Sequence, residues 1–508
     1  MTQPADPRAL AALVFLAGTG SLATEIAASR LLAPYYGTST IVWANVIGLV
    51  LASLAVGYWL GGRLADRRPS PRLLGAIVLA AAALTAAIPF AAQPLLEVTA
   101  DGLDRISAGA VIGSFAAALA LFVPPVLLLG MVSPFAIRLA ITDASTAGAV
   151  AGRFFALSTV GSLLGAFLPA LVTIPLVGTQ RTFLAAAALL ALASTFLLGR
   201  RWLVAAAALA ALVLVPPGAV KAADGVLFEG ESRYQFIQVR ERAGARYLYL
   251  NEGVAVHSIW RRDHVLTGGE WDMFLIVPPL TGRRFERVAI LGNAGGTTAR
   301  AIRAFYPEAH VDGVELDGDV NDVARRYFGQ RESAKLDVHT EDARPFLRRT
   351  RARYDLIVVD AYRQPYVPFY LATREFFELA RARLAPGGIL ALNVASVPGD
   401  ERLSEGITGT MAWAFPQVWR WRPLRFNELV LGLSSPAPKD VLDARLGAVD
   451  PRLGVLARMW RADARLAGRN DRPWTDDRAP VEWITDRMIV EYGLEGGDLD
   501  EDYLPTRP

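Results

Sequence analysis

The sequence predicts an α-helical transmembrane bundle followed by a doubly wound α/β domain. Residues 9–217 are dominated by Ala, Leu, Val and Gly, whereas the chain beyond 218 is mixed and rich in Arg, Asp and Glu. The second part contains short apolar runs that end in glycines or acids and alternate with helical segments, a pattern typical of a parallel sheet covered by helices. We therefore predict a multi-pass domain at 1–217, a small β subdomain at 218–282 and an α/β domain at 283–508.

The composition narrows the class of protein. A hydrophobic fraction of 53% and a mean hydropathy of +0.31 are averages over two unlike parts of the 508-residue chain. A net charge of only +3 gives no reason to expect nucleic-acid binding. The absence of cysteine excludes disulfides, thiolate metal sites and cysteine nucleophiles.

Seven apolar runs approach the ~20 residues needed to cross a bilayer. The first has a lone Arg8 as its basic flank and is followed by six more runs, so we interpret it as an uncleaved helix rather than a signal peptide. The seventh is the shortest and ends in two prolines. The runs are 9–29, 41–62, 73–92, 110–132, 153–176, 181–199 and 202–217.

Arginines cluster in alternate loops between these runs, which predicts a cytoplasmic N-terminus in the cell (inner) membrane. Seven spans then place the C-terminal domain outside, where adenosyl cofactors are scarce. We favour a cytoplasmic domain because its predicted chemistry needs a metabolite made in the cytosol. The clustered arginines are Arg63, Arg67, Arg68, Arg72, Arg138, Arg153, Arg200 and Arg201.

Two features of the predicted bundle go beyond a scaffold. Glu25 lies inside the first span, where an ionisable side chain is costly and indicates function, although a structural ion pair with Arg30 is an equally good reading. The basic loop 61–68 is similar to a loop of major-facilitator transporters, but any positive-inside turn has this composition.

A glycine-rich loop and a following acid predict an adenosyl site in the α/β domain. The strand 287–291 runs into Gly292, Gly295 and Gly296, and Glu315 ends the next strand 23 residues after Gly292. Such glycines let the backbone approach a ligand, and an acid about 20 residues further on binds ribose hydroxyls. The loop is not GxGxxG, which favours the methyltransferase-type variant of the Rossmann-like fold over a dinucleotide site.

Acids also follow the next two predicted strands. Asp342 follows the strand 335–340, and Asp360 follows the strand 354–359. Because the carboxyl ends of parallel strands line the ligand crevice, we expect these acids to meet there with Glu315. Each could alone be a turn former or helix cap, but three behind a glycine loop favour an adenosine-type ligand.

These motifs resemble the spermidine synthase (polyamine aminopropyltransferase) family, in its membrane-fused bacterial branch. The resemblance covers nearly the whole chain. It rests on Glu25, Arg30, 34–37, Trp43 and 61–66 in the first part, and on 250–253, 314–317, 341–343, 360–362 and 475–482 in the second.

The resemblance implies an aminopropyl transfer from decarboxylated S-adenosylmethionine to an amine, with methylthioadenosine released. It implies cofactor-binding roles for Gly292, Gly295, Gly296, Glu315, Asp317, Asp342 and Ala343, and catalytic roles for Asp360 and Tyr362. Substrate-binding candidates are Glu252, His257, Glu270, Asp272 and Arg363. It also implies pairing of two copies through the N-terminal strands of the family fold. The histidines show no metal spacing, so we predict no metal.

Three departures from the family pattern concern the acceptor. The glycine loop lacks the family's acid, and Arg363 stands where the family has a second aspartate, so that a diamine would meet a like charge. Glu270 replaces a family tyrosine. We therefore predict an enzyme that uses decarboxylated S-adenosylmethionine or S-adenosylmethionine with an acceptor other than putrescine, or with none. The alternative is a membrane sensor or transporter subunit that binds a nucleoside or polyamine without turnover.

Overall fold

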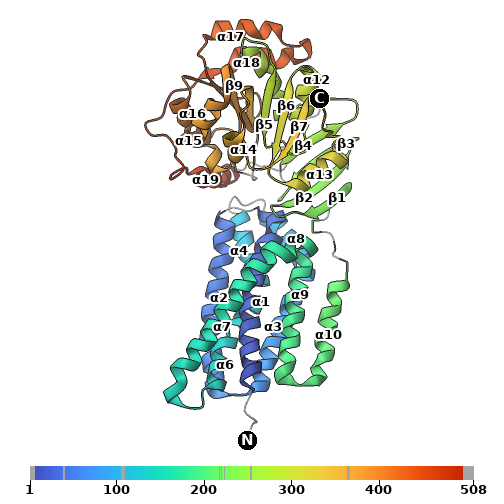
Figure 1. Cartoon of the computed structure of the whole chain (residues 1–508), viewed down its shortest axis with the longest axis vertical. Helices are drawn as coiled ribbons and strands as arrows, with labels where there is room; N and C mark the ends of the chain where they lie inside the picture. Colours follow the sequence, from blue (N-terminus) through green and yellow to red (C-terminus); the bar gives the residue numbers. More distant parts are fainter. Residues whose placement is uncertain are drawn as a thin grey trace. The chain divides into compact units, whose positions relative to one another are not determined.

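The computed structural model describes residues 6–37, 40–103, 109–216, 218, 220–221, 223–251, 255–362 and 366–495. They form two compact units, the first comprising 1–222 with 231–236 and the second 223–230 with 237–508. The division falls near the predicted boundary at 217. Figure 1 shows helices alone in the first unit and mixed strands and helices in the second.

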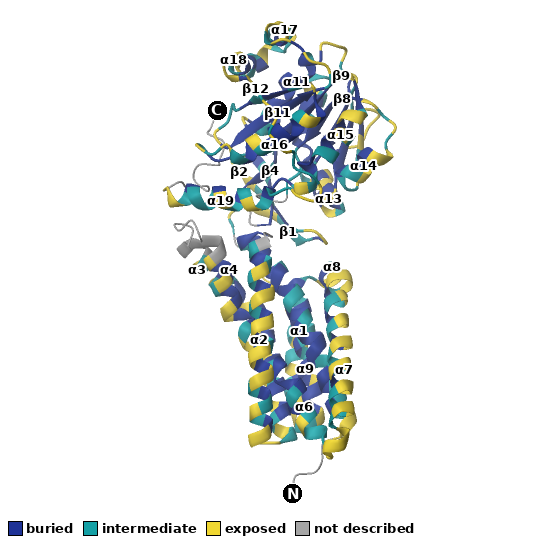
Figure 2. Cartoon of the chain, turned by 90° about the vertical axis from the view of Figure 1, so that its left-hand side faces the viewer, coloured by how far each residue is buried: buried dark blue, intermediate teal, exposed yellow. Residues whose placement is uncertain are grey.

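The first unit is a helical bundle around the first helix. Its helices are α1 (Pro7–Tyr36), α2 (Thr40–Arg67), α3 (Pro71–Leu103), α4 (Gly109–Leu121), α5 (Val123–Gly130), α6 (Val132–Ala140), α7 (Ala147–Leu168), α8 (Ile174–Val177), α9 (Thr179–Leu198) and α10 (Leu203–Ala211). α1 contacts α2, α3, α4, α5, α6, α7 and α9, and most of its side chains are buried (Figure 2).

Glycines allow the closest approach in this bundle, between α1 and α7. A Cβ on Gly161 would lie 2.1 Å from the Phe15 carbonyl oxygen, and one on Gly165 would lie 2.2 Å from that of Thr19. Small residues let helices pack closely where lipid supplies no hydrophobic drive. The outer faces carry exposed Trp59, Phe155 and Phe167, as lipid contact requires.

Six helical stretches among the described residues are long and apolar enough to cross a membrane: Pro7–Tyr36, Ile41–Arg67, Pro71–Thr99, Val123–Ala140, Ala144–Val177 and Thr179–Leu198. The predicted seventh span, 202–217, is only a nine-residue helix, α10, followed by a 3₁₀ turn at Leu212–Leu214. Val215 is extended, because a residue before proline is forced out of the helical region. The described part of the chain thus contains six apolar helical stretches of membrane-crossing length.

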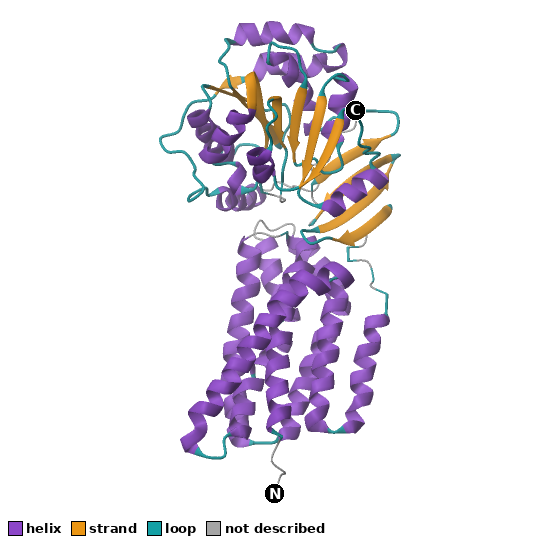
Figure 3. Cartoon of the chain, viewed as in Figure 1, coloured by secondary structure: helices purple, strands orange, loops and turns teal. Residues whose placement is uncertain are grey.

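The second unit contains two sheets (Figure 3). β1 (Val226–Glu231), β2 (Phe236–Arg242), β3 (Ala245–Leu250) and β4 (Val256–Arg261) form a four-stranded sheet in that order. The larger sheet has the order β12-β10-β11-β9-β8-β5-β6-β7. Its strands are β5 (Arg287–Leu291), β6 (His310–Glu315), β7 (Leu336–Thr340), β8 (Tyr354–Val359), β9 (Leu384–Ala395), β10 (Gln417–Trp421), β11 (Asn427–Leu433) and β12 (Arg465–Leu466).

The five strands β7, β6, β5, β8 and β9 run parallel, and β11 pairs antiparallel with β9. This mixed sheet confirms the predicted Rossmann-like, methyltransferase-type class. The apolar runs predict strands buried on both faces, and β5, β6 and β8 are indeed buried along almost their whole length.

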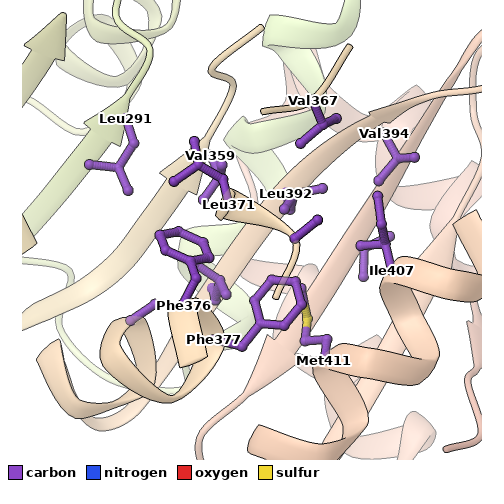
Figure 4. Packing of buried hydrophobic residues seen from close by; sticks show 14 of the residues in the cluster. Leu291, Val359, Val367, Leu371, Phe376, Phe377, Leu392, Val394, Ile407 and Met411 are labelled. Carbon is purple, nitrogen blue, oxygen red and sulfur yellow. The ribbon is translucent and has the colours of Figure 1, made fainter. Parts of the chain in front are cut away.

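Helices cover both faces of the large sheet. One face is packed by α14 (Ala343–Arg349), α15 (Arg374–Arg383), α16 (Arg402–Ala414) and α19 (Val481–Leu494), and Figure 4 shows Phe376, Phe377 and Met411 in this core. The other face is packed by α11 (Val277–Leu280), α12 (Thr297–Phe305), α17 (Lys439–Arg445) and α18 (Gly454–Asp463). α13 (Gly318–Tyr327) packs on the small sheet. The two cores fix the strand ends that carry the predicted acids.

Candidate active site

The loop after β5 is shaped by a glycine that no other residue could replace without strain. Gly292 has a φ of +90°, and a Cβ there would lie 2.5 Å from the Cα of Ala361. Its N–H donates to the Val314 carbonyl at 2.9 Å. The loop is therefore held against the carboxyl ends of β6 and β8, the edge at which open α/β sheets bind their ligands.

Gly295 and Gly296 connect this loop to its surroundings. The N–H of Gly295 donates to Ser258 Oγ at 2.8 Å, and a Cβ would lie 2.7 Å from that of Ser258. Gly296 has a φ of +82° immediately before α12. Both glycines thus support the loop's close packing on β4 and the start of the helix. Ligand contacts by the three glycines remain a prediction.

The Glu315 carboxylate is held rigidly at the end of β6. Its Oε2 accepts from the N–H of Ala294 at 2.9 Å, and its Oε1 accepts from the N–H of Asp317 at 3.0 Å. The side chain is only 9% exposed. Burial raises the pKa of Glu315 to about 7, against the lowering effect of these N–H groups. Each oxygen keeps a further lone pair that could accept from a ribose hydroxyl.

The next predicted cofactor residues lie at helix starts. Asp317 caps α13 by accepting from the N–H of Asp319 at 3.1 Å. Asp342 caps α14, and its other oxygen accepts from the Tyr370 hydroxyl at 2.7 Å. Ala343, the first residue of α14, is 8% exposed. These contacts satisfy the capping requirement of both helices and place the residues beside the crevice edge.

Two carboxyl groups, Glu270 and Asp360, lie close enough to influence each other's charge. Asp360 follows β8, donates its N–H to the Leu291 carbonyl at 2.8 Å and accepts from Asn393 Nδ2 at 2.9 Å. Burial raises the pKa of Asp360 to about 7. Burial, and next the charge of Asp360, raise the pKa of Glu270 to about 8. Among the described residues, neither carboxyl forms an ion pair with Lys or Arg.

Asp272 organises the turn that presents Glu270. Its carboxylate accepts from the N–H of Thr267 at 2.9 Å, from the N–H of Gly268 at 2.8 Å and from the Thr267 hydroxyl. The side chain is 6% exposed. These bonds occupy the carboxylate, so the structure gives Asp272 a positioning role for the segment Glu270–Ile276.

The predicted catalytic tyrosine anchors the loop behind Asp360. The Tyr362 hydroxyl donates to the Asn393 carbonyl at 2.9 Å and accepts from the N–H of Ala395 at 2.6 Å. Further along the same segment, the Tyr366 hydroxyl donates to Asp486. Tyr362 therefore ties the acid-bearing strand end to β9, and its catalytic role remains a prediction.

His257 lies on β4 with a buried Nε2 that has no hydrogen-bond partner among the described residues. Burial lowers the pKa of His257 to about 4, so the ring is neutral at neutral pH. A neutral imidazole can accept a proton or a hydrogen bond, depending on its tautomer.

Two predicted substrate residues, Glu252 and Arg363, lie outside the described residues. Asp476, from the family's closing motif, pairs instead with Arg344 at 2.9 Å and accepts from Thr373 at 2.7 Å. Sequence reasoning missed Asn393, which links Asp360 to Asn427, whose Nδ2 lies 3.1 Å from Asn393 Oδ1. An asparagine inside the apolar run of β9 was the available signal.

At the opposite strand ends, His310, Asp312 and Asp337 bring ligand atoms within 4.8 Å of one another. Asp312 is already paired with Arg287 at 2.9 Å. This cluster lies at the amino ends of β6 and β7, away from the crevice.

With this geometry in view, the comparisons with known proteins agree with the motifs. Residues 271–420 match the spermine/spermidine synthase domain family. The chain is 35% identical over 189 residues to a probable polyamine aminopropyl transferase of Bifidobacterium longum, covering 37% of this chain and 42% of that protein. It is 29% identical over 307 residues to a polyamine aminopropyltransferase of Corynebacterium efficiens, covering 54% of this chain and 57% of that protein.

Among solved structures, a probable spermidine synthase from Corynebacterium glutamicum is 19% identical, with a TM-score of 0.40, over 49% of this chain and 92% of that one. The chain spans about half the length of the curated relatives it matches. The match of residues 271–420 to the spermine/spermidine synthase domain family confirms the resemblance drawn from the motifs.

Proposed function

We propose that the α/β unit binds decarboxylated S-adenosylmethionine, or S-adenosylmethionine, and releases methylthioadenosine. The observation that carries this proposal is the Glu270–Asp360 pair. Two buried carboxyls without a cationic partner among the described residues favour a positively charged ligand, because its charge offsets the burial that raises both pKa values and, at Glu270, also the effect of the Asp360 charge. Glu315, at the neighbouring strand end, supplies acceptors for a ribose.

The chemistry requires little covalent help from the protein. The attacking amine nitrogen forms a bond to the propyl carbon next to the sulfonium, the carbon–sulfur bond breaks, and neutral methylthioadenosine leaves. Alignment of the two reactants supplies most of the rate enhancement. The amine must give up one proton, and an ionised Asp360 is a suitable acceptor at a pH near its raised pKa.

We propose an acceptor other than putrescine, or none, as the loop containing Arg363 suggests. Purified protein is incubated with each donor, with and without putrescine, and methylthioadenosine is quantified. Methylthioadenosine formed from either donor supports an enzymatic function. Equal amounts of methylthioadenosine with and without putrescine indicate that the donor is cleaved without an acceptor. If no combination yields methylthioadenosine, turnover is rejected.

The path of the chain in the first unit bears on the side of the membrane. α9 ends beside the start of α3, since a Cβ on Gly75 would lie 2.9 Å from Leu198. The chain then reaches the other end of the bundle, where the Val220 carbonyl accepts from Tyr35 at 2.7 Å and Lys221 donates to the Pro34 carbonyl at 3.2 Å. Gly199 and Val220 thus lie towards opposite ends of the bundle, although α10 is short.

We therefore propose that the chain leaves the bundle on the side opposite its N-terminus. With the arginine-rich end in the cytoplasm, the α/β unit would face the exterior rather than the cytosol that the chemistry favours. This favours, as a second candidate, a sensor or transporter subunit that binds a nucleoside or polyamine without turnover. A C-terminal reporter active only outside the cytoplasm supports the exterior placement, and one active only inside contradicts it.

A further inference from the structure

The central helix of the bundle carries one acid in a protein environment. Glu25 is half-buried on α1, the helix that contacts seven others in the unit. Among the described residues it forms no ion pair, and the predicted partner Arg30 donates instead to the carbonyls of Ser232 and Arg233. The predicted Glu25–Arg30 pair is therefore absent from this part of the chain, and the carboxyl has no cation to offset its charge.

The packing of α1 against α7 shows what lies at the level of Glu25. The two helices run parallel, with Gly161 against Phe15 and Gly165 against Thr19. Contacting positions of the two helices differ by 140 to 146 residues, which places residues 165–171 at the level of Glu25. Glu25 also shares a helix face with Gly18, seven residues earlier, whose Cβ would lie 2.4 Å from the Ser158 carbonyl oxygen of α7.

At that level the regular helix is interrupted. Residues Pro169–Thr173 form a π-helical turn, a feature found frequently at functional sites. Pro175 follows and has no N–H to donate to the preceding turn, so the backbone there has an excess of acceptors. The Thr173 hydroxyl is in contact with that of Thr182 at 2.9 Å. This turn contacts α1, so its backbone and hydroxyl oxygens lie next to the helix that carries the acid.

A buried hydroxyl adds a second, independent observation. Ser21 lies one turn before Glu25 on the same face of α1, is 3% exposed, and its Oγ has no hydrogen-bond partner among the described residues. A buried hydroxyl without a hydrogen-bond partner lowers the stability of the fold. A ligand beside it would relieve that cost.

We propose that Glu25, Ser21 and the π-helical turn form an intramembrane site for a dehydrated monovalent cation, either an alkali ion or a small primary ammonium. The donor atoms are all oxygens, the preferred ligands of hard cations. One carboxylate balances one positive charge, whereas a divalent ion would leave a net charge in the apolar bundle at high cost. The site is independent of the proposed reaction in the α/β unit.

The test uses the full-length protein in detergent and a hydrophobic carbodiimide, which modifies protonated carboxyls within apolar surroundings. The rate of adduct formation at Glu25 is followed by peptide mass spectrometry in sodium, methylammonium or bulky N-methylglucamine chloride at equal ionic strength and pH. We expect sodium or methylammonium to slow modification about tenfold at ten times its dissociation constant, while N-methylglucamine does not. Protection by sodium alone or methylammonium alone identifies the cation, and equal rates in all three salts overturn the proposal.

Variants provide the controls. Glu25→Gln should abolish the increase in thermal unfolding temperature that the protecting cation produces, and Ser21→Ala should weaken the cation's apparent affinity. Glu97→Gln should keep the full increase, because Glu97 lies on α3 and already accepts from Gln93 at 3.1 Å. If Glu25→Gln does not fold, the Ser21→Ala variant tests the site instead. If the cation protects Glu25 from the carbodiimide equally well in Ser21→Ala and in the wild-type protein, the proposed site is wrong.

Discussion

The α/β unit buries acids in two different ways. Glu428 on β11 is 2% exposed, and its carboxylate accepts from Arg420 at 2.6 Å, from Arg422 at 3.2 Å and from Ser404. Burial alone would raise the pKa of Glu428, but hydrogen bonds from Arg420 and Ser404 hold it below its usual value. The acid is thus fully compensated within the fold.

Glu270 and Asp360 show the opposite arrangement. Burial raises both pKa values, and the described residues supply only amide and backbone partners near Asp360. A compensated acid contributes to the fold, whereas an uncompensated pair lowers stability until a cation arrives. The contrast indicates that Glu428 stabilises the fold, whereas Glu270 and Asp360 are suited to bind a ligand.

The largest expected effect is on turnover. Asp360→Asn removes the proposed proton acceptor but keeps the side-chain volume, so we expect methylthioadenosine formation to fall by about 10²–10⁴-fold. The unfolding temperature should be unchanged or higher, because an uncompensated charge is lost. Initial rates measure the loss of turnover, and thermal unfolding measures the change in stability. If Asp360→Asn is as active as the wild-type protein, Asp360 is not the proton acceptor.

At the compensated acid, the effect should appear in stability instead. Arg420→Met leaves Glu428 buried with a weaker partner set, and we expect a loss of about 3 kcal/mol in the free energy of unfolding. Arg422→Met, which removes the longer contact, is the matched control and should cost less. Chemical denaturation followed by tryptophan fluorescence measures both; equal small losses would show that the cluster contributes little.

The ribose assignment predicts an intermediate effect on binding. Glu315→Ala removes hydrogen bonds to a charged acceptor, worth about 1.5–3 kcal/mol, so adenosyl-ligand affinity should fall roughly 10–100-fold. Asp319→Asn is the control, since only the backbone of Asp319 contributes to the cap of α13. Calorimetry on both variants, with thermal unfolding to confirm folding, decides; unchanged affinity in Glu315→Ala contradicts the assignment.

The smallest expected effect is the pH dependence of the unliganded protein. The folded pKa of Glu270, about 8, lies above the ordinary glutamate value of 4.5 that applies in the unfolded chain. The unfolded state therefore binds fewer protons in this range, and stability is lost as the pH rises through 8. Between pH 6 and 9, the unfolding temperature of Glu270→Gln should fall less than that of the wild-type protein. The difference should be about 2–4 °C, which corresponds to roughly 1 kcal/mol in the free energy of unfolding. If the unfolding temperatures of the two proteins change equally with pH, Glu270 does not cause the loss of stability.

Much of the α/β architecture could be predicted from local patterns. The strands 287–291 and 354–359 coincide with β5 and β8, because continuous apolar runs bounded by glycine or acid specify buried parallel strands. β9 begins at Leu384 and includes Pro386 and Gly387, two residues that usually indicate a loop. Pairing with β8 at Tyr354 extends the strand through them.

The site was less predictable because roles depend on partners far apart in the sequence. Asp272 was predicted to bind substrate and Tyr362 to be catalytic, yet Thr267 occupies the Asp272 carboxylate and β9 the Tyr362 hydroxyl. Nothing near Glu270 in the sequence indicates that Asp360, 90 residues away, shares its charge environment. The Glu25–Arg30 pair failed similarly, because Arg30 finds carbonyls near residue 232.

The central claim is that Glu270 and Asp360 form an uncompensated acid pair that recognises a cation. Its most direct test is the number of protons exchanged when decarboxylated S-adenosylmethionine binds at pH 7.5, obtained by calorimetry in phosphate and Tris buffers. A cationic ligand should lower both pKa values, so we predict release of up to about one proton per ligand, with less released by Glu270→Gln. Binding of the ligand to the wild-type protein with no proton release, or with proton uptake, would contradict the claim.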